Sequence, residues 1–198
     1  MPARSSDQMR ETIFLIYTSG KRPVNRGAVA PPTWKFTMQT LKGSRVMTQL
    51  GLDYIRQCST FGALSDDGIR YLFKEGRVLQ LEKGETLFQL DDPGNRFYII
   101  LKGSFRFYKH HHDKCTYIRD HVFGEELGFI AMIALHNRRG SAHAAEASIV
   151  LEISSALFNR LQKSWPKDFG LLLLNLSRGM ARRIRELNNM LVERDFDS

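Results

Sequence analysis

The sequence predicts an α+β fold in which a β-roll or barrel is flanked by helices. Between residues 78 and 143, short apolar stretches alternate with glycine-containing turns at regular spacing, which is typical of closed β-structures. On both sides of this region, apolar residues recur every three or four positions, which is the period of amphipathic helices. A segment of different composition precedes the first helices.

The composition indicates a globular protein with an excess of positive charge. Hydrophobic residues make up 42% and charged residues 25% of the 198 positions, and no apolar run is long enough to span a membrane. Two cysteines, Cys58 and Cys115, are too few for a disulfide framework or an iron–sulfur cluster, which predicts a reducing, cytoplasmic location. The net charge of +8 fits a nucleic-acid or anionic partner, but charge alone favours a merely basic soluble protein.

Residues 1–46 are expected to form a basic, flexible N-terminal extension. The segment is rich in serine, glycine and proline, and it has no acidic residue after Glu11. Its apolar patch, residues 12–17, is too short and poorly flanked for a signal peptide. The alternative is a basic arm that contacts a partner or a membrane surface.

Residues 47–76 are expected to form the N-terminal helices. Ser65 precedes two acidic residues, which predicts a helix whose first turn is capped by the serine hydroxyl. Gly76 is expected to end that helix. Residues 77–154 are expected to form the β-roll, with a strand buried on both faces at 97–101 and a hairpin tip at 109–114.

Residues 155–198 are expected to form C-terminal helices. Ser154 or Ser155 caps the first, Pro166 breaks it, and one long amphipathic helix runs from Asp168. The apolar stripe of this helix needs a partner, either the β-roll of its own chain or a second chain. Its members are Leu173, Leu176, Met180, Ile184, Leu187 and Leu191.

The segment 122–145 carries the residues expected to bind a ligand. A helix that opens after Gly124 would present unpaired backbone N–H groups to an anion. Arg139 can donate a planar fork of hydrogen bonds to phosphate oxygens. A carboxylate of Glu125 or Glu126 can accept hydrogen bonds from sugar hydroxyls. Together these groups predict a site for a nucleotide monophosphate.

This segment resembles the phosphate-binding cassette of cyclic nucleotide-binding domains, as found in Crp/Fnr regulators, cyclic-nucleotide-dependent kinases and gated channels. The family pattern is F-G-E-(L/I)-A-L followed by R-(S/T)-A. Further matches upstream follow the family order, and the resemblance covers roughly residues 61–189. The matching residues are Phe123, Gly124, Glu125, Leu127 and Gly128, then Arg139, Gly140, Ser141 and Ala142, and upstream 84–88, 92–95, 97–101 and 102–103.

The resemblance implies a double-stranded β-helix, or jelly-roll, with a long C-terminal helix that dimerises and closes over the base. It implies a ribose ligand at Glu125 or Glu126, since counting from either side of the pair selects a different one, and a phosphate ligand at Arg139. Gly140 replaces the usual serine or threonine, whose hydroxyl favours cyclic GMP, so cyclic AMP is favoured. The expected ligand-binding residues are Phe123, Gly124, Glu125, Glu126, Leu127, Arg138, Arg139, Gly140, Ser141 and Ala142.

Two features depart from the family pattern. The segment between glutamate and arginine is about three residues longer than usual, and the family's hydroxyl is missing at Gly140. These departures keep open a different anion, such as cyclic di-GMP, or a degenerate domain that serves as a protein-interaction module. A third alternative is a nucleic-acid binder that uses the basic segments.

The predicted function is a cyclic nucleotide-binding regulatory protein, not an enzyme, with no cofactor. A homodimer through residues 168–194 would pass the signal to an unknown protein. The chain ends soon after Leu191, so a helix-turn-helix domain, and with it sequence-specific DNA binding, is not expected. No metal site is expected either, because His110, His111 and His112 are adjacent and do not face one point.

Overall fold

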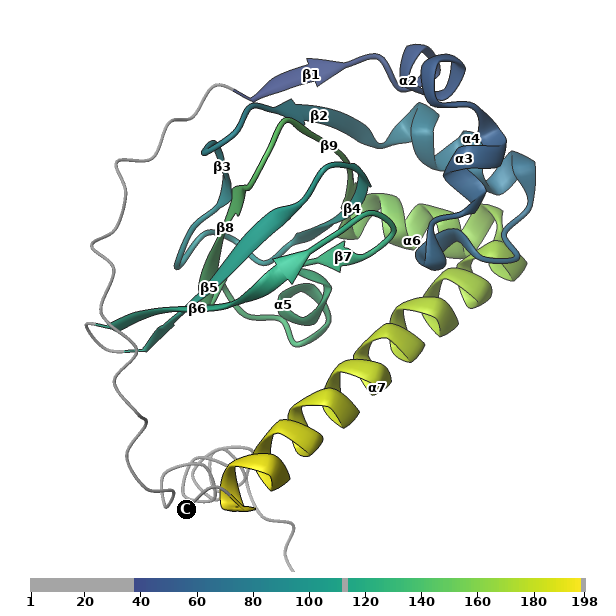
Figure 1. Cartoon of the computed structure of the whole chain (residues 1–198). Helices are drawn as coiled ribbons and strands as arrows, with labels where there is room; N and C mark the ends of the chain where they lie inside the picture. Colours follow the sequence, from purple (N-terminus) through teal and green to yellow (C-terminus); the bar gives the residue numbers. More distant parts are fainter. Residues whose placement is uncertain (1–37, 112–113, 197–198) are drawn as a thin grey trace, which may run out of the picture.

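Two antiparallel sheets and a set of helices at one end make up the fold (Figure 1). The computed structural model describes residues 38–111 and 114–196. The strands are β1 (Gln39–Leu41), β2 (Arg77–Leu81), β3 (Thr86–Phe88), β4 (Arg96–Lys102), β5 (Phe105–His111), β6 (Lys114–His121), β7 (Glu126–Leu127), β8 (Gly140–Ala144) and β9 (Ser148–Ser154). The helices are α2 (Gly43–Leu50), α3 (Leu52–Arg56), the 3₁₀ helix η1 (Ser59–Phe61), α4 (Asp66–Glu75), α5 (Phe129–Ile133), α6 (Ser155–Ser164) and α7 (Pro166–Phe196).

The sheets have the strand orders β1-β2-β9-β4-β7 and β3-β8-β5-β6, and they face each other as a roll. Strand β4 lies between two cores because its successive side chains point to opposite faces. Tyr98 and Ile100 pack between the sheets, whereas Phe97, Ile99 and Leu101 pack under the helices. All five side chains are buried, which confirms the strand predicted to be buried on both faces. The predicted jelly-roll flanked by helices is thereby confirmed.

Helix boundaries follow the capping residues read from the sequence. The Ser65 hydroxyl accepts a hydrogen bond from the Gly68 N–H (3.0 Å), and the Ser154 hydroxyl accepts one from the Leu157 N–H (3.2 Å). Helix α4 ends before Gly76, and α7 begins at Pro166, where a missing N–H costs nothing. The caps at Ser65 and Ser154 and the helix end at Gly76 are confirmed, whereas α7 begins two residues before the predicted Asp168.

Two elements differ from the sequence expectation at the N-terminal side. Strand β1 and the first residues of α2 fall within the segment expected to be an extension, because residues 39–41 pair with β2. The single helical pattern expected from Met47 is split into α2 and α3 by Gly51, whose φ of 79° no helix interior accepts. Some sequence-based predictions concern residues 1–37 and His112, which lie outside the described residues.

The helix expected to open after Gly124 begins at Phe129 instead. Gly124 has a φ of 82° and donates its N–H to the Ile100 carbonyl (2.9 Å), so it belongs to the turn that leads into β7. Leu127 then pairs with Tyr98 of β4 and is buried between the sheets. Pairing with β4 extends the chain through residue 127, and Gly128 becomes the residue before the helix.

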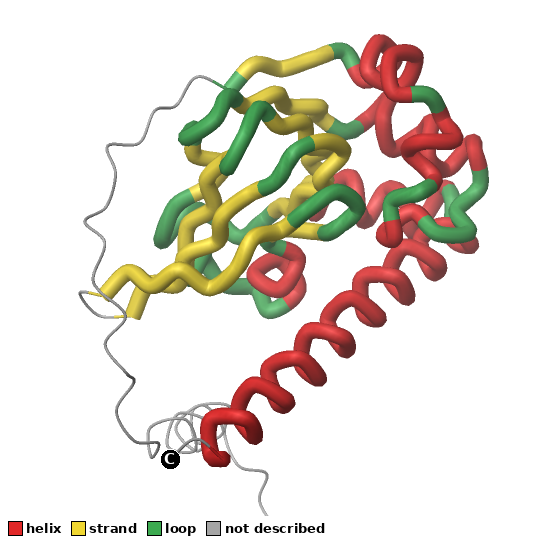
Figure 2. Tube along the Cα trace, in the orientation of Figure 1, coloured by secondary structure: helices red, strands yellow, loops and turns green. Residues whose placement is uncertain are grey.

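Helix α7 leaves α6 and runs past the β-roll toward its far end, while the other large helices gather at one end (Figures 1 and 2). The first half is anchored, since Leu172 and Leu176 are buried against η1 and α6. The second half carries exposed apolar side chains at Ile184, Leu187 and Leu191. Within the described ranges, no helix combines the length and the apolar character that crossing a membrane requires.

One buried carboxylate ties α7 to α4. Asp168 accepts hydrogen bonds from the Ser65 N–H (2.6 Å) and the Ser65 hydroxyl (2.9 Å). We expect Asp168→Ala to lower the free energy of unfolding by about 2 kcal/mol, because two charge-assisted hydrogen bonds are lost and a backbone N–H loses its acceptor. Urea denaturation measures this, with the exposed neighbour Lys167→Ala as a control that changes stability by less than about 0.5 kcal/mol. Equal stability of the two variants would contradict the assignment.

Candidate functional site

A cavity of about 520 Å³ lies between the segment 122–145 and helix α7. Its size is in the range typical of small-molecule sites. Strands β3, β5 and β6 contribute to its wall, together with the loop 136–140. Among the predicted residues, six line it: Glu125, Glu126, Leu127, Arg138, Arg139 and Gly140.

Arg138 is the largest fully buried side chain of the described residues. Its Nη1 donates to the Gly128 carbonyl (2.8 Å), and its Nη2 donates to the Arg96 carbonyl (2.6 Å). The guanidinium lies over the Phe88 ring, 4.4 Å from its centroid. Its Nε is buried and has no hydrogen-bond partner among the described residues. The two carbonyls and the ring thus fix the orientation of the side chain.

The positive charge of Arg138 has no ion-pair partner among the described carboxylates. Burial lowers the pKa of its guanidinium, while Tyr98 and Asp92 act in the opposite direction. A buried cation that is held only by neutral acceptors is costly, and an anion in the cavity would offset that cost. This arrangement is chemically suited to binding a phosphate.

Gly128 is what allows the arginine to lie there. A Cβ atom at this position would overlap the Arg138 guanidinium, and the φ of 87° is one that other residues rarely adopt. Gly128 matches the family motif, but it was not among the residues expected to bind the ligand.

Arg139, which the sequence singled out for phosphate, is exposed and lies at the cavity wall near Lys109. The structure therefore buries the neighbour of the arginine that the motif selected. The Gly-Ser-Ala sequence that follows the two arginines does not decide which of them turns inward.

Gly140 has no room for a side chain. A Cβ here would overlap the Tyr108 carbonyl oxygen and the Phe107 ring. Ser141 cannot replace the missing hydroxyl, because its Oγ lies 3.0 Å from His110 Nε2 and it does not line the cavity. Ala142 is buried between the sheets and also lies off the cavity wall.

The two glutamates are in different environments. Glu125 forms an ion pair with Arg119 (3.0 Å) and accepts the Val122 N–H (3.1 Å). Glu126 accepts only the Phe129 N–H (3.0 Å), and its other oxygen has no hydrogen-bond partner among the described residues. Burial raises the pKa of Glu126, opposed by the Phe129 N–H. Glu126 is therefore the glutamate with acceptor capacity left for a ligand.

Two predicted residues serve the architecture and do not reach the cavity. The Phe123 ring packs on Tyr54, with centroids 4.7 Å apart. The Gly124 carbonyl accepts hydrogen bonds from Ser59 (3.0 Å) and Thr60 (2.7 Å). They place the start of the segment 122–145 against η1.

The sequence did not predict the part of the cavity wall that is formed by elements outside the segment 122–145. The arginines of α7 were visible beside its apolar stripe, but no local pattern connected β3, β5, β6 and α7 to one cavity. Lining residues missed in this way include Phe88, Lys109, Arg119, His121, Gly128, Arg182, Arg183 and Glu186.

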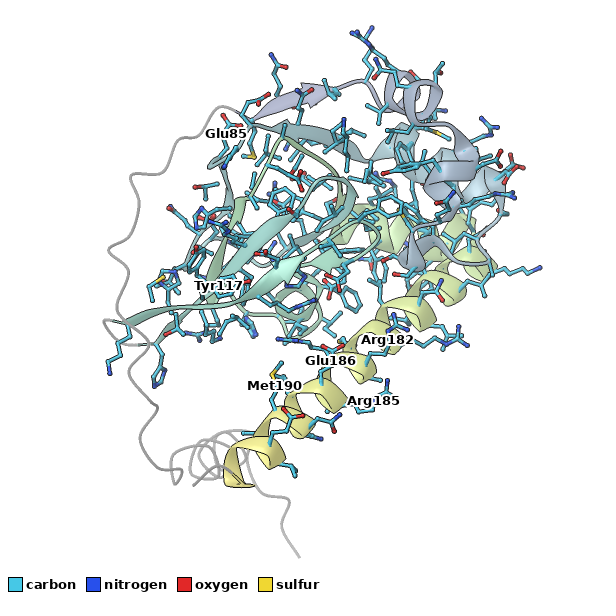
Figure 3. The ribbon with its side chains drawn as sticks, in the orientation of Figure 1. Glu85, Tyr117, Arg182, Arg185, Glu186 and Met190 are labelled. Atoms are coloured by element: carbon cyan, nitrogen blue, oxygen red, sulfur yellow. The ribbon has the colours of Figure 1, made fainter. Side chains whose placement is uncertain are left out.

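Helix α7 closes one side of the cavity. Asn175 donates to the carbonyls of Thr60 (3.2 Å) and Gly62 (2.7 Å), which fixes the first half of the helix. Further along, Arg183 pairs with Glu186 (3.0 Å). Figure 3 shows Glu186 and Met190 on the side of α7 that faces the β-roll, and Arg185 on the opposite side.

The fold and this cavity define a class: a jelly-roll domain with a buried arginine, a glutamate and a long helix around an internal pocket. Residues 78–164 match the family model described as the cyclic nucleotide-binding domain. This match confirms, for residues 78–164, the resemblance to cyclic nucleotide-binding domains that the motifs predicted.

Solved structures share the fold. A cyclic nucleotide-binding domain from Methylobacillus flagellatus superposes with a TM-score of 0.69 at 22% identity, covering 79% of this chain and 89% of that one. The catabolite activator protein of Thermus thermophilus gives 0.59 at 22% identity, covering 70% and 63%.

Curated relatives are much longer proteins. A lysophospholipase NTE1 of Mycosarcoma maydis is 26% identical over 106 residues, which are 54% of this chain and 5% of that protein. A neuropathy target esterase sws of Drosophila persimilis is 25% identical over 186 residues, 86% of this chain and 13% of that protein. The chain thus spans only a small part of the length of these relatives.

His121, in the cavity wall, is held neutral. Arg119 Nη2 lies 3.1 Å from its Nδ1, and a guanidinium can only donate, so this nitrogen accepts. The Glu125 carboxylate, 3.7 Å from the same nitrogen, does not offset this. Burial, reinforced by Arg119 and Arg183, lowers the His121 pKa from 6.5 to about 3.

A depressed histidine pKa makes the fold sensitive to acid. Below pH 6.5 His121 becomes protonated in the unfolded chain, whereas in the folded chain it stays neutral down to about pH 3. Between pH 7.5 and pH 5 this residue should cost about 2 kcal/mol of stability, and His121→Gln should remove that part of the loss. Urea denaturation at both pH values measures the difference, and an unchanged pH dependence in the variant would contradict a neutral imidazole.

Proposed function

We propose that this cavity binds a cyclic nucleotide and that Arg138 holds its phosphate. The observation that carries the proposal is the buried guanidinium without a described ion-pair partner. A cyclised phosphate carries one negative charge and acceptor oxygens that match a guanidinium edge. Nη1 and Nη2 each carry two N–H groups and each donates to one backbone carbonyl, so the guanidinium keeps donor capacity for an oxygen of the ligand.

Glu126 is the proposed acceptor for the ribose 2′-hydroxyl. Glu126 and Arg138 both line the cavity. Burial raises the pKa of Glu126, and the charge of Arg138 acts against that rise. Glu125 is a weaker candidate because Arg119 and the Val122 N–H already occupy its oxygens. The pair Glu126 and Arg138 thus places ribose and phosphate side by side.

The base would lie against α7, and its contacts there would shift the packing of the helix. The second half of α7 is the part with exposed apolar side chains, so it can move while Asn175 keeps the first half in place. Cyclic AMP is the proposed mononucleotide, since the position where a hydroxyl would favour cyclic GMP is Gly140 and is sterically closed. The signal would pass to a cytoplasmic partner protein.

The phosphate and ribose roles can be tested by calorimetry with cyclic AMP and 2′-deoxy cyclic AMP. We expect Arg138→Gln to weaken both ligands by about tenfold or more, because a charge-assisted contact is lost. Glu126→Gln should weaken cyclic AMP several-fold and reduce its advantage over the deoxy ligand. Arg185→Gln, on the opposite side of α7, is the matched control and should leave both affinities unchanged.

Absence of any cyclic nucleotide binding by the wild type would overturn the proposal. The domain would then be a protein-interaction module of the same fold. In a second contradicting outcome, Arg138→Gln binds as tightly as the wild type and Arg139→Gln is impaired for every ligand. The phosphate would then be bound by Arg139, the arginine that the sequence motif selects.

The exposed stripe on α7 also supports a proposed homodimer through residues 168–194. Ile184, Leu187 and Leu191 recur at helical spacing, and each is more than 40% exposed. Sedimentation equilibrium at micromolar concentration should give a mass of two chains for the wild type and one chain for Leu187→Glu, because a buried charge opposes the interface. A wild-type protein that is strictly monomeric would contradict the dimer.

A further inference from the structure

The cavity carries more positive charge than one cyclised phosphate requires. Six basic and three acidic side chains line it, and His121 is neutral, so its lining has a formal charge of +3. The basic residues are Lys109, Arg119, Arg138, Arg139, Arg182 and Arg183, and the acidic residues are Glu125, Glu126 and Glu186.

Ion pairs account for only part of this charge. Glu125 pairs with Arg119, and Glu186 pairs with Arg183. Glu126 has no such partner, and it is the proposed ribose ligand. Lys109, Arg138, Arg139 and Arg182 form no ion pair with a described carboxylate. A cyclic mononucleotide would occupy Arg138 and leave the other three cations without an anion.

Lys109 and Arg139 form a second basic cluster at the same cavity. Lys109 of β5 is paired in register with Gly140 of β8, so it lies beside the residue that follows Arg139. Burial and the charge of Arg139 both lower the pKa of Lys109, so the two like charges repel each other. An anion bound beside both cations would relieve this repulsion.

The cluster is separate from the proposed phosphate site. The Arg138 guanidinium is buried under the carbonyls of Gly128 and Arg96, whereas the Arg139 side chain is exposed. Two phosphates joined directly to each other would need one continuous set of donors. Two phosphates separated by nucleosides fit one buried and one open donor group.

We propose that the ligand carries a second phosphate, bound by Lys109 and Arg139, and that its chemical class is the cyclic dinucleotide. The inference rests on the proposed phosphate role of Arg138 and adds a second subsite to the same cavity. The second nucleoside would lie toward the open side, where Arg182 of α7 faces the cavity.

Calorimetry with cyclic AMP, cyclic GMP, cyclic di-AMP and cyclic di-GMP tests the proposal on the full chain. We expect at least one cyclic dinucleotide to bind about tenfold more tightly than either mononucleotide, the effect of one added charge-assisted contact. Its affinity should also fall more steeply with salt, since more charge is neutralised. Lys109→Gln and Arg139→Gln should reduce the ratio of dinucleotide to mononucleotide affinity by several-fold, and Arg185→Gln should preserve it.

The outcomes separate the two proposals. Mononucleotide binding that equals or exceeds dinucleotide binding overturns the second subsite and leaves the proposed function standing. A dinucleotide preference that survives both substitutions overturns the assignment to Lys109 and Arg139. Failure of all four ligands to bind overturns the proposed function and this inference together.

Discussion

The central constraint of this structure is a guanidinium buried without a carboxylate partner among residues 38–111 and 114–196. Arg138 is held by two backbone carbonyls and the face of Phe88, which orient it without neutralising it. The surrounding structure permits this because Gly128 has no side chain that would overlap the guanidinium. An uncompensated interior charge is costly, and an anion bound in the cavity would offset that cost.

The fold was predictable because several local signals agree with one another. Serine caps, turn glycines and the apolar run at 97–101 are short-range features, and each has one structural solution. The start of α5 was not predictable in the same way. Its position depends on the pairing of Leu127 with Tyr98, a contact between distant segments that no local pattern encodes.

The candidate site was only partly readable from sequence for the same reason. The motif located the segment and both arginines. Which arginine is buried depends on how the residues between Glu126 and the arginines fold, and the motif does not specify this. The residues of β5, β6 and α7 are distant in the chain, so their convergence on the cavity is a property of the roll itself.

Gly140 has a consequence for how this domain can evolve. Its Cα sits against the Tyr108 carbonyl and the Phe107 ring, so even alanine would force β5 away from β8. A single codon change to serine or threonine at this position is therefore closed as a route to altered base preference. Under the proposed function, exposed charged side chains that line the cavity, such as Lys109 and Arg139, are more open to exchange than this strand position.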